Sequence, residues 1–269
     1  MPVASLAMYA APEPVAAANA AWWADLRARL VATGVTALPE TLDTDLGYDE
    51  AWHRPDLVLA QACGYPYVNK LQGRVRLVAT PCYAYEGCYG PFSGSLIVVR
   101  RDAAFGDIGA LFGSRVAING KDSNSGMNLL RLMIAPHAIK GRFFSACLET
   151  GGHRASLAAV AGNRADIAAI DTVTFGHLRR FAPEEVANVR ILARTPIGPG
   201  LPLITRGSAS DAFVAALRQA LRQFVDDPST ADLRETLAIR DFALLDDSHY
   251  ERLRDFEREA QRLGYPEIA

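Results

Sequence analysis

The sequence lacks the features of membrane-spanning and nucleic-acid-binding proteins. No segment approaches the roughly 20 consecutive apolar residues that a membrane span requires, and Lys and Arg are scattered rather than gathered into runs. With a formal net charge of −2 and a pI near 6.2, the chain offers no strongly basic surface to nucleic acid or an anionic membrane. By elimination we expect the partner to be a small molecule. We also expect a monomer.

Several catalytic and cofactor motifs are also missing. No Gly-x-Gly-x-x-Gly follows a predicted strand, and the sequence contains no Gly-x-Ser-x-Gly elbow and no His-Glu-x-x-His pair. The stretch from Gly113 to Lys121 misses the P-loop pattern on spacing and because Asp122 follows the lysine. The histidines have no neighbours at metal-ligand spacing. We therefore expect neither a metal nor a cofactor.

Cysteine is scarce, with four residues, Cys63, Cys82, Cys88 and Cys147. Their number and irregular spacing exclude a disulfide scaffold or a zinc site. Two alternatives stay open, a bridge between Cys82 and Cys88 in an oxidising compartment, or buried reduced thiols.

The N-terminus lacks the basic region and the following apolar region of a signal peptide, and it reads directly as a strand. We expect a periplasmic location if a signal peptide was removed from the chain, and a cytoplasmic one otherwise.

Strand and helix patterns alternate along a chain of 269 residues, half of them hydrophobic, which is long enough for well-buried cores. Short segments rich in Val, Leu and Ile predict strands at 3–8, 56–62, 75–80, 95–100, 115–118, 143–150, 166–170 and 189–194. Apolar residues at three- and four-residue spacing and cap residues predict helices at 15–33, 65–70, 107–112, 124–134, 154–161, 172–180, 210–225 and 248–263. The alternation favours an α/β fold with mostly parallel sheets.

Two connectors rich in Gly and Pro, residues 81–91 and 195–202, enclose one self-contained α/β block. We therefore predict two lobes, a discontinuous lobe 1 of residues 1–87 plus 195–269 and a lobe 2 of residues 88–194. Because ligands of open α/β sheets bind beyond the carboxyl ends of strands, we expect the ligand in a cleft between the lobes.

The segment most suggestive of binding is the turn between the strand Arg115–Ile118 and the helix that starts near Asn124. Backbone N–H groups at a helix start have no intrahelical partner, and the helix dipole is positive there. Ser123 and Ser125 add hydroxyl donors to this turn. The segment therefore predicts a site for a small oxyanion.

Four segments resemble the substrate-binding proteins of phosphonate and phosphate ABC transporters, which have the type II periplasmic-binding-protein fold. They occur in that family's order and spacing and cover about residues 75–205. The segments are Ser95-Leu-Ile-Val-Val-Arg-Arg-Asp102, Asp122-Ser-Asn-Ser-Gly126, Gly151 to Val160 together with Ala165 to Asp171, and Thr195 to Pro202. The resemblance implies two lobes joined by a hinge.

The resemblance also implies roles for individual residues. The family's phosphonate loop corresponds to Ser123, Asn124 and Ser125, and its histidine corresponds to His153. An aromatic wall is implied around Tyr65 and Tyr67 and in the loop that holds Tyr83, Tyr85 and Tyr89. Val173 and Leu201 stand where binders of aminophosphonates carry carboxylates, and Ser93 replaces a tyrosine. These departures argue against a ligand with a primary amine.

Each candidate also has a structural interpretation. Ser123 or Ser125 can serve as a helix N-cap, and His153 can hydrogen-bond to the backbone. Asp171 ends a strand and can either cap the next helix or accept a hydrogen bond from a protonated oxyanion. Tyr9 follows the first strand and can be a core residue. The candidate ligand-binding residues are Ser123, Asn124, Ser125, Gly126, His153, Asp171, Tyr9, Tyr67, Tyr89 and Ser93.

The leading functional hypothesis is a solute-binding protein of an ABC-type uptake system. The ligand would shift an equilibrium between open and closed lobes, and the loaded protein would deliver it to a permease. The first alternative is an intracellular lyase or synthase on the same fold, for which His153, Asp171 and Cys63 are the available acid–base or nucleophilic groups. The second alternative is a stand-alone ligand-sensing protein.

Overall fold

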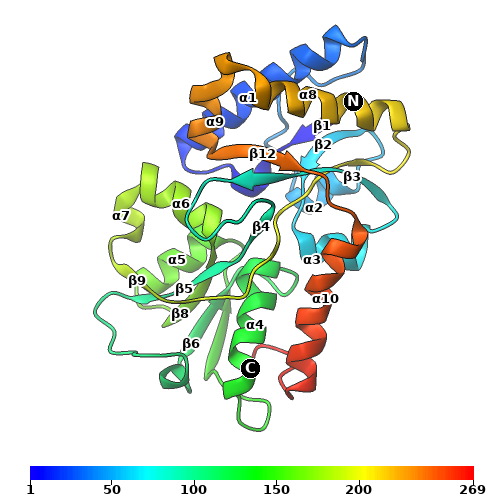
Figure 1. The fold of residues 1–269 in the computed structure, drawn as a ribbon. Coiled ribbons are helices and arrows are strands. Elements are labelled where there is room, and N and C mark those ends of the chain that lie inside the picture. Colours follow the sequence, from blue (N-terminus) through cyan, green and yellow to red (C-terminus); the bar gives the residue numbers. More distant parts are fainter. The chain divides into compact units, whose positions relative to one another are not determined.

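The computed structural model describes all residues of the chain, 1–269. The chain divides into two compact units (Figure 1), each with a five-stranded sheet. Unit 1 contains residues 1–84, 88–91 and 200–249. Unit 2 contains residues 85–87, 92–199 and 250–269.

The sheet of unit 1 has the strand order β1-β2-β11-β3-β12. Its strands are β1 Val3–Ser5, β2 Leu57–Gln61, β3 Val75–Tyr83, β11 Leu203–Arg206 and β12 Ile239–Ala243. β2 is parallel to β1, whereas β11 is antiparallel to β2 and β3, and β12 is antiparallel to β3. This sheet is mixed, whereas the sequence predicts a mostly parallel one. The antiparallel strands β11 and β12 come from the segment after residue 200, where the chain re-enters unit 1, and local sequence patterns do not predict with which strands this segment pairs.

Helices cover both faces of this sheet. They are α1 Glu13–Ala32, α2 Tyr48–Trp52, α3 Gly64–Pro66, α8 Asp211–Asp226 and α9 Ala231–Leu237. α8 and α9 lie on one side of the sheet, and α2 and α3 lie on the other (Figure 1). In the core, the Trp22 ring of α1 lies 5.8 Å from the rings of both Phe224 and Phe242. The predicted first strand is shorter than expected, because a 3₁₀ turn at Ala7–Tyr9 follows Ser5 after one residue.

The sheet of unit 2 has the strand order β7-β6-β8-β5-β9. Its strands are β5 Ser95–Arg100, β6 Arg115–Ile118, β7 Ala146–Glu149, β8 Ile167–Asp171 and β9 Val189–Arg194. β6 is parallel to both β7 and β8, and β5 is antiparallel to both β8 and β9. Since only β5 is reversed, this sheet has the mostly parallel character that the sequence predicts. A separate two-stranded ribbon pairs β4 Phe92–Ser93 with β10 Gly198–Pro199.

The helices of unit 2 are α4 Leu129–Ile134, α5 His153–Ala161, α6 Thr172–Phe181 and α7 Pro183–Val186. Their buried residues include Leu157 and Val160 of α5 and Leu178 of α6, which share one hydrophobic cluster with Val98 and Ile170 of the sheet. α4 is preceded by a wider π-helical turn at Asn124–Asn128, within the predicted helix 124–134.

The C-terminal segment 250–269 packs in unit 2, whereas the sequence-based division placed it in lobe 1. It contains most of α10 Asp247–Arg262. Asn128 donates to the carbonyl oxygen of Leu253 at 3.0 Å, and Arg131 donates to that of Pro266 at 2.8 Å. The apolar stripe of this helix predicts burial, but it does not specify which core buries it.

No helix of the structure is both long and apolar enough to cross a membrane. None of the four cysteines forms a disulfide, so the bridge between Cys82 and Cys88 is absent from the structure.

Candidate functional site

The predicted oxyanion turn forms a helix start at the carboxyl end of β6. Ser123 is extended, with φ −77° and ψ 129°, and is the N-cap residue. Its hydroxyl accepts a hydrogen bond from Gly126 N–H at 3.0 Å. The capping interpretation of Ser123 is therefore confirmed. A serine cap is uncharged, so it occupies one amide donor without neutralising the positive end of the helix.

Gly126 allows the turn to pack against the loop before it. A Cβ at this position would lie only 2.6 to 2.9 Å from the side-chain atoms of Asn119. Asn119 is held in turn by the hydroxyl of Ser156, which donates to its Oδ1 at 3.2 Å. A larger residue at 126 would push the turn away from β6.

Ser125 is fixed from two sides within unit 2. Its hydroxyl lies 2.8 Å from Nε2 of His153. Its carbonyl oxygen accepts a hydrogen bond from the hydroxyl of Ser95, also at 2.8 Å. The residue is buried. Two of the predicted site residues, Ser125 and His153, are thus in direct contact.

His153 is the first residue of α5, after Gly152, which offers no side-chain cap. Its Nδ1 lies 3.2 Å from the carbonyl oxygen of Ala169 and 3.3 Å from the backbone nitrogen of Asp171. Burial lowers the pKa of the imidazole, and the negative charge of Asp171 opposes that shift. In the empty protein the neutral imidazole is therefore favoured.

Asp171 caps α6, as one of the two predictions for it proposes. Its Oδ1 accepts hydrogen bonds from Val173 N–H at 2.9 Å and Thr174 N–H at 3.0 Å. The residue is only 2% exposed. Its carboxylate is therefore committed to the start of its own helix.

Three helix starts meet the same edge of the unit 2 sheet. The parallel strands β7, β6 and β8 are neighbours. β7 and β6 are each followed by a loop and a helical start, capped by Gly152 and Ser123, whereas β8 runs directly into α6 with its last residue, Asp171, as the N-cap. The positive ends of these helical segments face the carboxyl edge of the strands. An anion at the Ser123 start would gain from this field and from amide donors of the first turn.

The remaining candidates lie elsewhere. Ser93 belongs to the β4–β10 ribbon, opposite Gly198, and is partly exposed. Tyr9 and Tyr67 are buried in unit 1, where the Tyr9 ring meets Tyr83 edge-on at 5.5 Å. Tyr67 donates its hydroxyl to Asp247. Tyr89 also belongs to unit 1 and is 64% exposed. The ligand roles of these four residues stay predictions.

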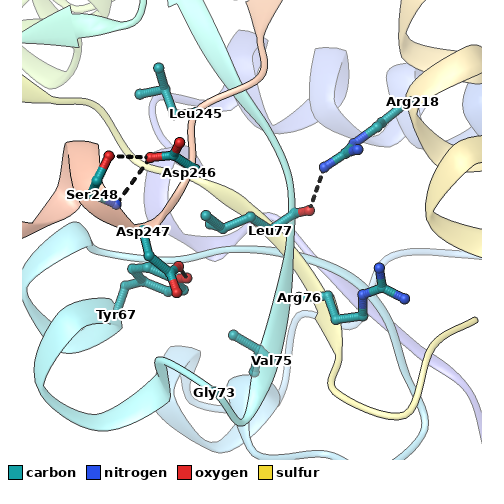
Figure 2. A pocket seen from close by; sticks show the side chains of 10 residues that line it. All are labelled: Tyr67, Gly73, Val75, Arg76, Leu77, Arg218, Leu245, Asp246, Asp247 and Ser248. Carbon is teal, nitrogen blue, oxygen red and sulfur yellow. Dashed lines mark hydrogen bonds between the residues drawn. The ribbon is translucent and has the colours of Figure 1, made fainter. Parts of the chain in front are cut away.

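Unit 1 also contains a cavity of about 450 Å³ that sequence reasoning missed. Figure 2 shows the residues that line it, which include Tyr67, Arg76, Arg218 and Asp246. Its charged groups already have protein partners. Arg76 binds Asp211 at 2.6 Å, Arg218 donates to the carbonyl oxygens of two neighbouring β3 residues, and Asp246 accepts from Ser248 at 2.6 Å. Since these charged groups already have partners within the protein, we favour the Ser123 helix start as the ligand site.

Two supporting residues, Ser95 and Asn119, carry no sequence signal of their own. Ser95 is 30 positions from Ser125, and the two meet because Ser95 pairs with Asp171 in the β5–β8 ladder. Only the assembled sheet reveals this contact. The structure contains no cluster of three or more His, Cys, Asp or Glu residues that could hold a metal ion.

Two solved structures share the architecture of this chain. A binding protein component of an ABC phosphonate transporter from Pseudomonas aeruginosa superposes with a TM-score of 0.77 at 18% identity, over 97% of this chain and 87% of that one. PhnD1 from Prochlorococcus marinus, in complex with methylphosphonate, superposes with a TM-score of 0.75 at 14% identity, over 97% and 98%. These likenesses confirm the predicted type II periplasmic-binding-protein fold.

Sequence comparison then gives the family. Residues 9–250 match the family described as ABC transporter, phosphonate, periplasmic substrate-binding protein. The chain belongs to this family, as its sequence motifs predict. It is also 25% identical over 122 residues to the phosphonates-binding periplasmic protein of Escherichia coli strain K12, a match that spans 44% of this chain and 36% of that relative.

Proposed function

We propose that the protein is the solute-binding component of an ABC-type uptake system, located in the periplasm, and that it binds a small phosphonate or phosphate-like oxyanion. One observation carries the proposal. The uncharged Ser123 cap, the Ser125 hydroxyl and the His153 ring converge on one helix start at the carboxyl edge of the unit 2 sheet. Family membership and the methylphosphonate bound to PhnD1 support this choice of ligand class.

The chemistry of this helix start suits a tetrahedral oxyanion. Amide N–H groups of the first turn and the hydroxyl of Ser125 are hydrogen-bond donors, and a protonated His153 adds positive charge. Asp171, whose carboxylate accepts from Val173 and Thr174, is proposed as a structural neighbour of the ligand rather than a contact. Lobe closure and delivery to a permease remain part of the proposal.

The contact between Ser125 and His153 also fits a second function, a hydrolase with Ser125 as nucleophile and His153 as base. A third group usually orients the base in such an enzyme. Here Nδ1 faces a backbone carbonyl and an amide, while the Asp171 carboxylate is bound to α6. This arrangement favours binding over turnover, and we expect no hydrolysis of p-nitrophenyl acetate or p-nitrophenyl phosphate above that of Ser125→Ala.

Titration calorimetry with methylphosphonate, phosphite, phosphate and sulfate tests the proposal. We expect at least one of the first three to bind, and Ser125→Ala to weaken binding about tenfold or more, since a hydrogen bond to a charged group contributes about 1.5–3 kcal/mol. Ser145→Ala is the matched control, because Ser145 precedes β7 at the opposite end of that strand and its hydroxyl donates to a backbone carbonyl. Absence of binding by methylphosphonate, phosphite and phosphate would contradict the proposal.

A further inference from the structure

His153 has two different hydrogen-bonding environments around its ring. Nε2 faces the Ser125 hydroxyl at 2.8 Å, a group that can donate or accept. Nδ1 faces the carbonyl oxygen of Ala169, which only accepts, and the N–H of Asp171, which only donates. A protonated Nδ1 can donate to the Ala169 carbonyl oxygen but cannot accept from Asp171 N–H. An unprotonated Nδ1 can accept from Asp171 N–H but cannot donate to Ala169.

The protonation state of the ring decides which way the Ser125 hydroxyl points. When the only ring proton is on Nδ1, it is donated to Ala169, and Nε2 accepts the hydrogen of Ser125. The lone pairs of the hydroxyl then face outward and repel an anion. When Nε2 is protonated, it donates to Ser125, and the hydroxyl hydrogen is available to an external acceptor.

The rest of Ser125 cannot adjust to compensate. Its carbonyl oxygen is held by the buried Ser95, and the next residue, Gly126, is held by the Ser123 cap. The main chain is therefore fixed, and the contact with Nε2 at 2.8 Å holds the hydroxyl oxygen, so the hydroxyl hydrogen is the part that can reorient. His153 controls that reorientation.

We propose that His153 is a positioning residue that aims the Ser125 hydroxyl, and that an anion bound at this helix start draws one proton from solvent onto Nε2 of His153. The inference rests on the proposed function, because it concerns the same ligand. A new N–H bond forms at Nε2, the proton comes from water or buffer, and no bond of the ligand breaks.

The electrostatic surroundings agree with this step. Burial lowers the pKa of the empty ring, so the ring is neutral at neutral pH, and we assign its one proton to Nδ1, which lies 3.2 Å from the carbonyl oxygen of Ala169. Asp171 of β8 is the charged group that acts on the ring, and it favours the protonated form. Arg154, the next residue of α5, is paired with Glu185 of α7, whereas Ser125 and Ala169 present uncharged atoms. A bound anion adds a second negative charge and raises the pKa further.

Calorimetry with methylphosphonate in two buffers of different ionisation enthalpy counts the protons taken up on binding. For the wild type at pH 7.5 we expect a larger net uptake of protons than for His153→Gln. The free ligand is the same in both titrations, so the difference in proton uptake between the two proteins reports the ionisation that depends on His153. We expect the wild-type affinity, relative to His153→Gln, to fall by up to about tenfold per pH unit as the pH rises from the pKa of His153 in the empty protein to its higher pKa in the complex, and to level off above that.

Two variants separate positioning from simple loss of structure. His153→Ala removes both ring nitrogens and should weaken binding about tenfold or more. His153→Gln keeps a non-titrating amide donor and should restore much of that loss, while binding becomes independent of His153 protonation. His53→Gln, at an exposed histidine of unit 1, is the matched control and should behave as wild type.

The outcomes distinguish this inference from the proposed function. Binding by the wild type with the same proton uptake in His153→Gln overturns the inference and leaves the proposed function standing. Wild-type affinity in His153→Ala overturns it as well. If the wild type binds none of methylphosphonate, phosphite and phosphate, both proposals fail.

Discussion

Two helical segments of unit 2 begin in the same manner and differ in the charge of their cap. The segment after β6 is capped by Ser123, whose hydroxyl accepts one N–H bond, from Gly126. The helix after β8 is capped by Asp171, whose carboxylate accepts two N–H bonds, from Val173 and Thr174. Both caps lie at the carboxyl ends of adjacent parallel strands.

The difference in cap charge shows how two helices that begin at the same edge of a sheet can have different roles. One helix start is stabilised by its own cap, and the other is left able to bind an anion. A carboxylate satisfies the amide donors and offsets the positive end of the helix dipole, so nothing remains to attract an anion. A serine satisfies one donor and leaves the field in place. The charge of the cap, rather than the presence of a cap, separates the two sites.

Ser123→Asp tests this comparison most severely, because it gives the first helix start the cap of the second. The aspartate can still accept from Gly126 N–H, but it places a negative charge beside the proposed ligand. Two unit charges about 4 Å apart interact by roughly 4 kcal/mol near a protein surface. We therefore expect the affinity for methylphosphonate to fall at least about a hundredfold in calorimetry, with little change in thermal stability.

Ser210→Asp is the matched control, since Ser210 caps α8 of unit 1 through a hydrogen bond from Phe213 N–H. It introduces the same substitution at a serine cap outside the proposed site, and we expect unchanged affinity. Ligand affinity retained in Ser123→Asp would show that the anion does not bind at this helix start.

Gly126→Ala tests a second difference between the two helix starts. The third residue after the cap is Gly126 in one and Thr174 in the other. A Cβ at 126 would meet Asn119 at 2.6 Å, so we expect the free energy of unfolding in urea to fall by about 1–3 kcal/mol through overpacking. Gly106→Ala, at an exposed loop position where a Cβ meets nothing within 4 Å, should change it by less than about 0.5 kcal/mol. Equal stability of the two variants would contradict this account.

Local sequence patterns predict the parts of the site that depend on neighbouring residues. The position of the Ser123 helix start and the cap at Asp171 follow from a buried strand that runs into cap residues, and the structure contains both. The family resemblance supplies His153, whose contact with Ser125 is present, although its ligand role is still a prediction.

Contacts between distant residues lie beyond this reasoning. The bond between Ser95 and Ser125 requires the β5–β8 register, and the bond between Tyr67 and Asp247 joins residues 180 positions apart. The antiparallel β11 and β12 likewise depend on where the chain returns. Tertiary packing determines each of these hydrogen bonds and strand pairings, and local sequence patterns do not predict them.

The smallest expected difference is in how much each cap contributes to the free energy of unfolding. Asp171→Ala removes a buried carboxylate that accepts two N–H bonds and should lower the free energy of unfolding by about 2 kcal/mol. Ser123→Ala removes an acceptor for one N–H bond and should lower it by about 1 kcal/mol. Asp171→Asn keeps a good capping side chain, so urea unfolding should show most of the stability retained. An equal loss at the two positions would mean that the second N–H bond accepted by Asp171 adds nothing to the stability of its helix, and the contrast between the two caps would then concern ligand binding alone.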